Sequence, residues 1–319
     1  MILRSNSSSS SIIGSSSSIH RSSSRSSSRS KSRSNNMATT IHTDEESLLL
    51  SIPTQPSPSP STTRHPFVQW TASQLRETAI CLVIAIAGFY LPKLLFFPTE
   101  EQINSRPLPY TTLASSGEIL MDFRYSHDVV YPPTVGSSFL VFTGIWVPLI
   151  LILTIEFIRK QHPAAILNSL FTAIGLAETL TTTLKFWVRR PRPNYFALCE
   201  FSVDTKQCTA PFHKVVEAQL SFPSGHTSLS FCSMTVLVLW LYQMNKSSGN
   251  NKWKLFLSAL IPWGWATFCG VSRIVDYWHH PSDVLAGCLL GSACATLCYT
   301  IHHTTTPSAA AAAAAKSSH

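Results

Sequence analysis

The chain has little charge for its length. Of its 319 residues, 13% are charged and 45% are hydrophobic, which disfavours a soluble protein. No C-x2-C pair occurs, so the ligand spacing of a structural zinc site is absent. The formal charge of +8 does not form one basic face, because many cations lie in a serine-rich N-terminal tail and the rest cluster at short polar segments or between apolar runs. This distribution disfavours nucleic acid as a partner.

The eight cysteines do not follow the pattern of a disulfide scaffold. Cys199 and Cys208 lie in a polar connection with eight residues between them. They would pair if that connection faces an oxidising compartment and would otherwise stay as two thiols, and the sequence leaves both outcomes open. The other six fall inside apolar runs, where a free cysteine behaves as a small hydrophobic residue: Cys81, Cys232, Cys269, Cys288, Cys294 and Cys298.

Three domains are expected. Residues 1–75 hold serine runs, arginines interleaved with serine, and Pro-Ser repeats, a composition that predicts a disordered cytosolic tail. A phosphorylated regulatory tail, a tether to anionic lipid and a merely solvated tail all remain open. Residues 304–319, with their alanine run, are expected to be a short disordered C-terminal tail.

Residues 76–303 are predicted to be an all-α integral-membrane bundle. Six runs are apolar and long enough to span a bilayer, which disfavours a soluble all-α domain. Pro92 and Lys93 predict a kink or an earlier exit in the first run, and Glu178 predicts that one face of the third looks into the bundle. Small residues such as Gly287 and Gly291 predict close helix packing in the last run. The expected spans are 77–97, 136–158, 164–187, 226–244, 254–274 and 282–302.

Basic residues in two short connections predict the orientation. Arg159 and Lys160 follow the second run, and Lys246, Lys252 and Lys254 follow the fourth, which favours the cytosol for these connections and for both termini. The other connections then face the lumen or the extracellular space. Five basic residues on that side oppose the charge rule: Arg189, Arg190, Arg192, Lys206 and Lys214. Lys206 and Lys214 have no assigned role.

Three polar segments stand at the ends of the apolar runs, at residues 185–193, 223–226 and 272–283. They supply fixed cations, a Ser-Gly turn at a predicted helix N-terminus, two histidines and a carboxylate. Phosphoryl transfer without a metal ion needs such an inventory. Because the segments adjoin membrane spans, a lipid substrate is expected.

The segments resemble the signatures of the type 2 phosphatidic acid phosphatase (PAP2) family, also called lipid phosphate phosphatases. The resemblance covers about residues 76–303 and leaves the N-terminal quarter unexplained. Residues 223–226 are similar to the PSGH signature without change. The signatures K-x6-RP and SR-x5-H-x3-D are matched in type and spacing by Lys185, Arg192, Pro193, Ser272, Arg273, His279 and Asp283.

The resemblance implies that His279 attacks phosphorus and forms a phosphohistidine. Asp283 is expected to accept a hydrogen bond from the other ring nitrogen, although it also suits a helix N-terminus. His226 is expected to protonate the leaving alkoxide and then to activate water. Lys185, Arg192, Ser224, Gly225 and Arg273 are expected to bind the phosphate, and Ser224 also suits an N-cap.

Other polar residues near the signatures are not assigned to the core site. Arg189 and Arg190 suit contact with lipid headgroups. His213 and His280 have no signature support, and neither Asp276 nor Trp278 is expected to be catalytic.

The expected function is hydrolysis of phosphatidate to diacylglycerol and phosphate, with related lipid phosphomonoesters or diacylglycerol pyrophosphate as further substrates. No metal and no cofactor is expected. The alternatives are a lipid phosphotransferase, a sugar-phosphatase relative, and an inactive binding or transport protein, which the full set of signature residues disfavours. Soluble haloperoxidases share similar signatures but do not fit six spans. The endoplasmic reticulum, the vacuole or Golgi and the plasma membrane all remain open, as does a homo-oligomer.

Overall fold

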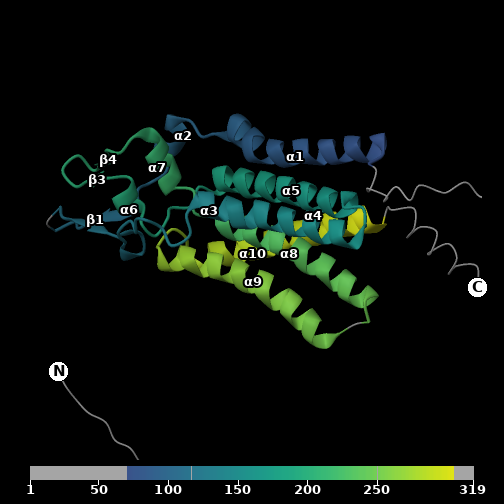
Figure 1. Ribbon diagram of the computed structural model, residues 1–319. Helices are drawn as coiled ribbons and strands as arrows, with labels where there is room; N and C mark the ends of the chain where they lie inside the picture. The colour runs from purple at the N-terminus through teal and green to yellow at the C-terminus, as the bar shows by residue number, and fades with distance from the viewer. Residues whose placement is uncertain (1–69, 116, 250, 305–319) are drawn as a thin grey trace, which may run out of the picture. The chain divides into compact units, whose positions relative to one another are not determined.

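The computed structural model describes residues 70–115, 117–249 and 251–304, and nearly all of both predicted tails lies outside these ranges. Within them, six helices are long and apolar enough to cross a membrane, as the sequence predicts (Figure 1). The largest shift is in the first helix, predicted from residue 77 and observed from Ala72. The spans are α1 (Ala72–Phe96), Ser137–Arg159, α5 (Ala164–Val188), α8 (Gly225–Ser247), α9 (Lys252–Val275) and α10 (Pro281–Thr304).

Large apolar side chains lie exposed on the outer helices. Leu94 on α1 is 81% exposed, Phe157 in the second span 70% and Ile261 on α9 68%. An exposed apolar surface of this extent is stable against lipid tails and not against water. The chain is therefore a multi-pass membrane protein.

Helices α5 and α8 form the interior of the bundle. Helix α5 packs against α1, α8 and α10, and α8 packs against α5, α9 and α10. The close approach predicted for α10 is confirmed, because a Cβ on Gly291 would lie 2.2 Å from the carbonyl oxygen of Ser228 on α8. On the other side of α5, a Cβ on Gly88 of α1 would lie 2.3 Å from the carbonyl oxygen of Gly175. Small residues therefore set the spacing of both helix pairs.

Prolines affect two spans differently. Helix α1 continues through Pro92 to Phe96, so the earlier exit that Pro92 and Lys93 suggested is wrong. The second span consists of α3 (Ser137–Val141), a π-helical turn η2 (Phe142–Trp146) and α4 (Val147–Arg159). Pro148 has no N–H to donate to the preceding turn, which accounts for the irregularity there.

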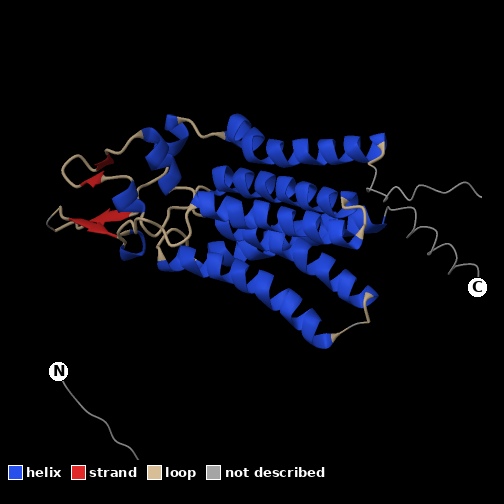
Figure 2. Ribbon diagram, in the orientation of Figure 1, coloured by secondary structure: helices blue, strands red, loops and turns tan. Residues whose placement is uncertain are grey.

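The spans are joined at one end of the bundle by long connections, and we call this the site end. Residues 97–136 and 189–224 form what we call the cap at this end (Figure 1). The cap departs from a purely helical fold by two short antiparallel hairpins, shown in red in Figure 2. Its elements are α2 (Glu100–Asn104), β1 (Tyr110–Thr112), β2 (Ile119–Met121), η1 (Phe123–Tyr125), α6 (Tyr195–Leu198), β3 (Phe201–Ser202), β4 (Gln207–Cys208) and α7 (Phe212–Ala218).

The cap has hydrophobic clusters of its own. Val216 and Leu220, which flank the end of α7, pack with Ile103 of α2 and with Phe186 from the last turn of α5. A second cluster joins α6 to α7 through Tyr195, Phe196, Cys199 and Ala218. These contacts fix α7 beside the ends of the membrane helices.

Candidate active site

All three signature segments lie at the site end, because α5 ends there, α8 begins there and the α9–α10 connection turns there. Helix α5 ends at Val188, after which Arg189 takes a left-handed conformation (φ 48°) and prolines keep the chain extended. The extended segment then runs beside residues 218–221, with a hydrogen bond of 2.8 Å from Arg192 N to the oxygen of Ala218. The first signature is thereby joined to the segment that precedes the second.

Lys185 lies in the last turn of α5, and its ammonium donates to the carbonyl oxygen of Leu220 at 2.9 Å. Among the described residues, no carboxylate forms an ion pair with this nitrogen. Its positive charge is therefore available to an anion in the adjoining space.

Arg192 is 4% exposed and is held on three sides. Its Nε donates to the oxygen of Glu217 at 2.8 Å, and a terminal nitrogen donates to the oxygen of Trp278 at 3.0 Å. The other terminal nitrogen pairs with the Glu217 carboxylate, and the guanidinium lies 5.0 Å from the ring centre of Trp278. Burial lowers the pKa of Arg192, while Glu217 and Asp283 act against this shift. The protein partners fix the orientation of the guanidinium. Each terminal nitrogen has a second hydrogen that it can donate to a ligand.

Arg273, at the end of α9, is 3% exposed and pairs with Asp276 at 2.8 Å. The same carboxylate accepts from the backbone N and the hydroxyl of Thr134, at 2.8 and 2.7 Å. The Arg273 oxygen in turn accepts from the backbone nitrogens of Trp278 and His279, at 3.0 and 3.1 Å. Asp276 therefore positions the arginine and ties the cap to the α9–α10 connection, a role that the sequence does not predict for it.

His279 is 3% exposed, and its Nδ1 lies 2.6 Å from the carbonyl oxygen of Ser221. A carbonyl oxygen only accepts, so Nδ1 carries the hydrogen and Nε2 keeps its lone pair in the neutral ring. Burial lowers the pKa of His279 well below its ordinary range, and Arg192, Lys185 and His226 shift it in the same direction. The ring is therefore neutral at neutral pH, which is the protonation state that a nucleophile needs.

Asp283 does not make the hydrogen bond that the sequence predicts. Its Oδ2 lies 3.9 Å from His279 Nδ1, close enough for charge stabilisation but too far for a hydrogen bond. Instead Oδ2 accepts from the hydroxyl of Ser221 at 2.6 Å and from the backbone N of His280 at 2.9 Å, and Oδ1 accepts from Arg190 at 2.5 Å. Asp283 holds Ser221, and Ser221 holds the imidazole. The expected role at the helix N-terminus is also present in the bond to His280.

Arg190 and Ser221 are thus site residues that sequence reasoning missed. Arg190 was expected to contact lipid headgroups, whereas it pairs with the fully buried Asp283 carboxylate. Ser221 stands outside every signature, and only its proximity to the PSGH segment could have drawn attention to it. His280, left unassigned, places its ring Nε2 3.1 Å from the oxygen of Pro191.

The PSGH segment begins α8, and Ser224 occupies its N-cap position without capping through its side chain. The Ser224 side chain makes no capping hydrogen bond and instead accepts from the Thr227 hydroxyl at 3.0 Å. Its backbone N donates to the oxygen of Asp283 at 3.0 Å, which joins α8 to α10. A Cβ on Gly225 would meet only Lys185 and Thr181 at ordinary distances of 3.7 and 3.8 Å. The first turn of α8 therefore keeps free donors and the positive end of the helix dipole facing the site.

His226, in the first turn of α8, has a buried Nε2 without a hydrogen-bond partner among the described residues. A buried polar atom of this kind is costly unless a ligand or water satisfies it. His226 lines the same cavity as His279. The nitrogen is therefore suited to contact a ligand in that cavity.

These side chains surround a cavity of about 700 Å³. Six of the eight predicted site residues line it, and Ser224 and Asp283 are buried behind them. The cap supplies further walls through Val129, Tyr131, Leu198 and α7. The lining residues from the predicted set are Lys185, Arg192, Gly225, His226, Arg273 and His279.

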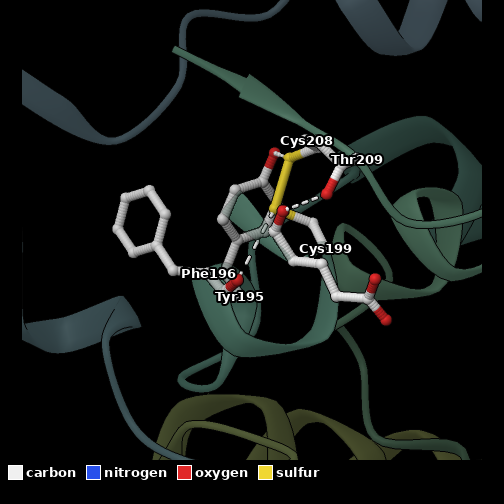
Figure 3. The surroundings of a disulfide bond; sticks show 6 residues. Tyr195, Phe196, Cys199, Cys208 and Thr209 are labelled. Carbon is white, nitrogen blue, oxygen red and sulfur yellow. Dashed lines mark hydrogen bonds between the residues drawn. A yellow bond between two sulfur atoms is a disulfide. The ribbon is translucent and has the colours of Figure 1, made fainter. Parts of the chain in front are cut away.

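Cys199 and Cys208 form a disulfide in the cap, with their Cα atoms 5.1 Å apart. Of the two outcomes that the sequence left open, the structure has the bonded one. Figure 3 shows the bond beside Tyr195 and Phe196 of α6, with Thr209 next to it. Thr209 donates through its backbone N and its hydroxyl to the oxygen of Glu200, at 3.2 and 2.7 Å. The disulfide therefore fixes the main chain at Glu200, which also lines the cavity.

Comparison with known proteins shows that the chain is similar to one family and to several proteins named as lipid phosphatases. A family model described as the PAP2 superfamily matches residues 166–307. Lipid phosphate phosphatase 1 of Arabidopsis thaliana is 38% identical over 145 residues, which cover 42% of this chain and 43% of that protein. Lipid phosphate phosphatase 2 of the same plant is 34% identical over 196 residues, 57% of this chain and 66% of that protein. Probable diacylglycerol pyrophosphate phosphatase 1 of Schizosaccharomyces pombe is 31% identical over 209 residues, 60% of this chain and 72% of that protein.

Proposed function

This chain belongs to the PAP2 superfamily, and from that premise we propose that it is an integral-membrane lipid phosphate phosphatase. The proposed reaction converts phosphatidate and water into diacylglycerol and phosphate. Related lipid phosphomonoesters and diacylglycerol pyrophosphate are further proposed substrates. The observation that carries the proposal is the single cavity lined by both signature histidines and by Lys185, Arg192 and Arg273.

The basic residues and the first turn of α8 bind the phosphate. Lys185 supplies a point charge, and Arg192 and Arg273 supply planar donors that are already oriented by protein partners. Gly225 lets the phosphate approach the free N–H groups of α8, and Ser224, buried behind them, supports this turn through its hydrogen bond with Thr227. Because these donors are fixed before the substrate arrives, little reorganisation is needed as charge moves in the transition state.

In the first chemical step, His279 Nε2 attacks phosphorus and forms an N–P bond. The bond from phosphorus to the ester oxygen breaks, and this oxygen receives a proton from His226 and leaves as the hydroxyl of diacylglycerol. The imidazole becomes positively charged. The carbonyl oxygen of Ser221 and the Asp283 carboxylate, 2.6 and 3.9 Å from Nδ1, stabilise that charge.

In the second step, neutral His226 removes a proton from water, and the water oxygen attacks phosphorus. The N–P bond breaks, the electron pair returns to His279, and inorganic phosphate leaves. His226 is then protonated and ready for another cycle. Each proton taken by one step is returned by the other, so the reaction needs no external acid or base.

Phosphate release is expected to be independent of divalent cations, because the fixed cations neutralise the substrate. Purified protein should release phosphate from micellar phosphatidate in EDTA at a rate within about twofold of the rate in Mg²⁺. Loss of activity in EDTA that Mg²⁺ or Zn²⁺ restores would contradict this mechanism. Failure to release phosphate from any lipid phosphomonoester under either condition would contradict the proposed function itself.

We further propose that the site end faces the lumen or the extracellular space. Basic residues gather in the short connections at the opposite end, which favours the cytosol there. The Cys199–Cys208 disulfide at the site end supports an oxidising compartment. The two arguments are independent, since one rests on charge and the other on redox chemistry.

A glycosylation acceptor in the β3–β4 turn tests this orientation. Val203 is 51% exposed, and Val203→Asn creates the acceptor sequence Asn-Asp-Thr with Asp204 and Thr205. Expression in a eukaryotic host should give a slower-migrating form that an endoglycosidase removes. The matched control is Val203→Asn with Thr205→Ala, which lacks the acceptor. A folded, active Val203→Asn protein without glycan would place the site end in the cytosol.

A further inference from the structure

The cavity extends beyond the residues that a single phosphate requires. At about 700 Å³ it has the size that proteins use for ligands larger than one phosphate group. Lys185, Arg273 and the two histidines come from the ends of the membrane helices. The wall toward the cap is formed by α7 and the disulfide hairpin, and it carries three charged side chains: Glu200, Lys214 and Glu217.

Lys214 differs from the other basic residues of the cavity in how it is held. Arg192 and Arg273 are almost fully buried and have several partners each. Lys214 pairs with Glu200 at 3.1 Å, and the two side chains are 45% and 53% exposed. Exposed ion pairs of this kind contribute little to stability. Lys214 can therefore exchange Glu200 for another anion at low cost.

The neighbouring carboxylates do not prevent this exchange. Glu217 is already paired with Arg192 through its carboxylate, so its charge is compensated. The backbone of Glu200 is fixed by Thr209 beside the disulfide, which keeps its carboxylate and hence Lys214 at the cavity wall. Lys214 is thus a half-exposed cation in the cavity wall that is available to bind an anion.

We propose that Lys214 is a specificity-determining residue that binds the second, non-reacting phosphate of a lipid diphosphate headgroup. The inference rests on the proposed function, because it takes the attacked phosphate to lie at His279. The phosphate attacked in a diphosphate is the terminal one. The inner phosphate, which carries the lipid, then lies farther from His279 than the terminal phosphate, toward the half-exposed Lys214.

The bonds formed and broken at the attacked phosphorus correspond to those in a monoester. His279 forms the N–P bond to the terminal phosphorus, and the bond from that phosphorus to the bridging oxygen breaks. The bridging oxygen stays with the inner phosphate, so the leaving product is a lipid phosphomonoester. Its charge rises as the bridge breaks, and Lys214 stabilises that charge in the transition state.

A pair of substrates and a matched pair of variants test the inference. Diacylglycerol pyrophosphate and phosphatidate are compared in the same micelles with wild type, Lys214→Gln and Lys206→Gln. Lys206 lies in the same cap, in the turn between β3 and β4, and does not line the cavity. Lys214→Gln should lower kcat/KM for the diphosphate about tenfold and leave phosphatidate within about twofold, as expected for one charge-assisted hydrogen bond. Lys206→Gln should change neither, and Lys214→Arg should recover most of the loss.

Equal losses on both substrates, or no loss on either, would overturn the inference while the proposed function stands. If wild type hydrolyses neither lipid, the proposed function fails, and binding decides the inference separately. Inorganic pyrophosphate should then bind wild type more tightly than Lys214→Gln by about tenfold in calorimetry, whereas orthophosphate should not distinguish them. Identical pyrophosphate affinities would overturn the role of Lys214.

Discussion

Replacing His279 by alanine is expected to lower kcat for phosphatidate hydrolysis by about 10⁴-fold or more, because the change removes the proposed nucleophile. The imidazole is buried and neutral, and the Ser221 carbonyl fixes the orientation of the ring and hence the direction of its Nε2 lone pair. Phosphate release from micellar phosphatidate measures the loss. The variant should still bind substrate, since the basic residues remain.

His213→Ala is the matched control, because His213 lies on α7, is exposed and does not line the cavity. It should keep activity within about twofold of wild type, the usual range for a surface change without contacts. Equal phosphate release by His279→Ala and wild type would remove the nucleophile from the mechanism.

Replacing Asp283 by alanine is expected to lower both activity and stability. The change leaves Arg190, the Ser221 hydroxyl and the His280 N–H without their acceptor. Of these donors the Ser221 hydroxyl is fully buried, and a buried donor left unpaired costs about 1–3 kcal/mol, whereas Arg190 is 33% exposed and keeps Ser282. The freed Ser221 no longer fixes the imidazole. We expect a loss of about 10²-fold or more in kcat, because misplacement of a reacting group by about 1 Å has an effect of this size.

Two further variants separate positioning from folding. Ser221→Ala removes the hydroxyl that binds Asp283 but keeps the carbonyl that binds His279, so its loss of kcat should be smaller, about tenfold. Ser282→Ala, which removes an exposed partner of Arg190, should leave kcat unchanged. Thermal unfolding in detergent gives the stability of each variant. An Asp283→Ala protein that unfolds earlier yet keeps its kcat would show that Asp283 only supports the fold.

The membrane helices and the meeting of the signature segments were predictable for physical reasons. A bilayer requires about twenty apolar residues per span, so length and composition alone locate the six helices. The signatures at the helix ends then imply that the connections carrying them meet. The structure agrees, since residues as distant in sequence as Lys185 and His279 line one cavity.

The sequence could not show which side chains of the site are hydrogen-bonded to one another. The bond from His279 to Ser221 spans 58 residues and the bond from Arg190 to Asp283 spans 93. Spacing within a signature suggested a direct bond between His279 and Asp283, but the first turn of α10 directs that carboxylate to Ser221 and Arg190 instead. Partners of this kind depend on how separate connections cross, and local patterns do not encode that crossing.

The cap was missed for a related reason. The strands of its hairpins are only two or three residues long, and its clusters join α2, α6 and α7 through single side chains such as Ile103 and Val216. Segments this short have no periodicity to read. Yet the cap places Glu217 on Arg192 and Lys214 at the cavity wall, so it determines part of the site.

Trapping the covalent intermediate tests the central claim most directly. Wild-type protein mixed with radiolabelled phosphatidate and quenched within milliseconds should carry label on the peptide that contains His279, as an acid-labile, alkali-stable phosphoramidate. The label should be absent from His279→Ala. In His226→Ala, which lacks the acid for the first step and the base for the second, the label should both form and disappear more slowly than in wild type. Label on any other residue, or label in His279→Ala at the wild-type level, would contradict the account.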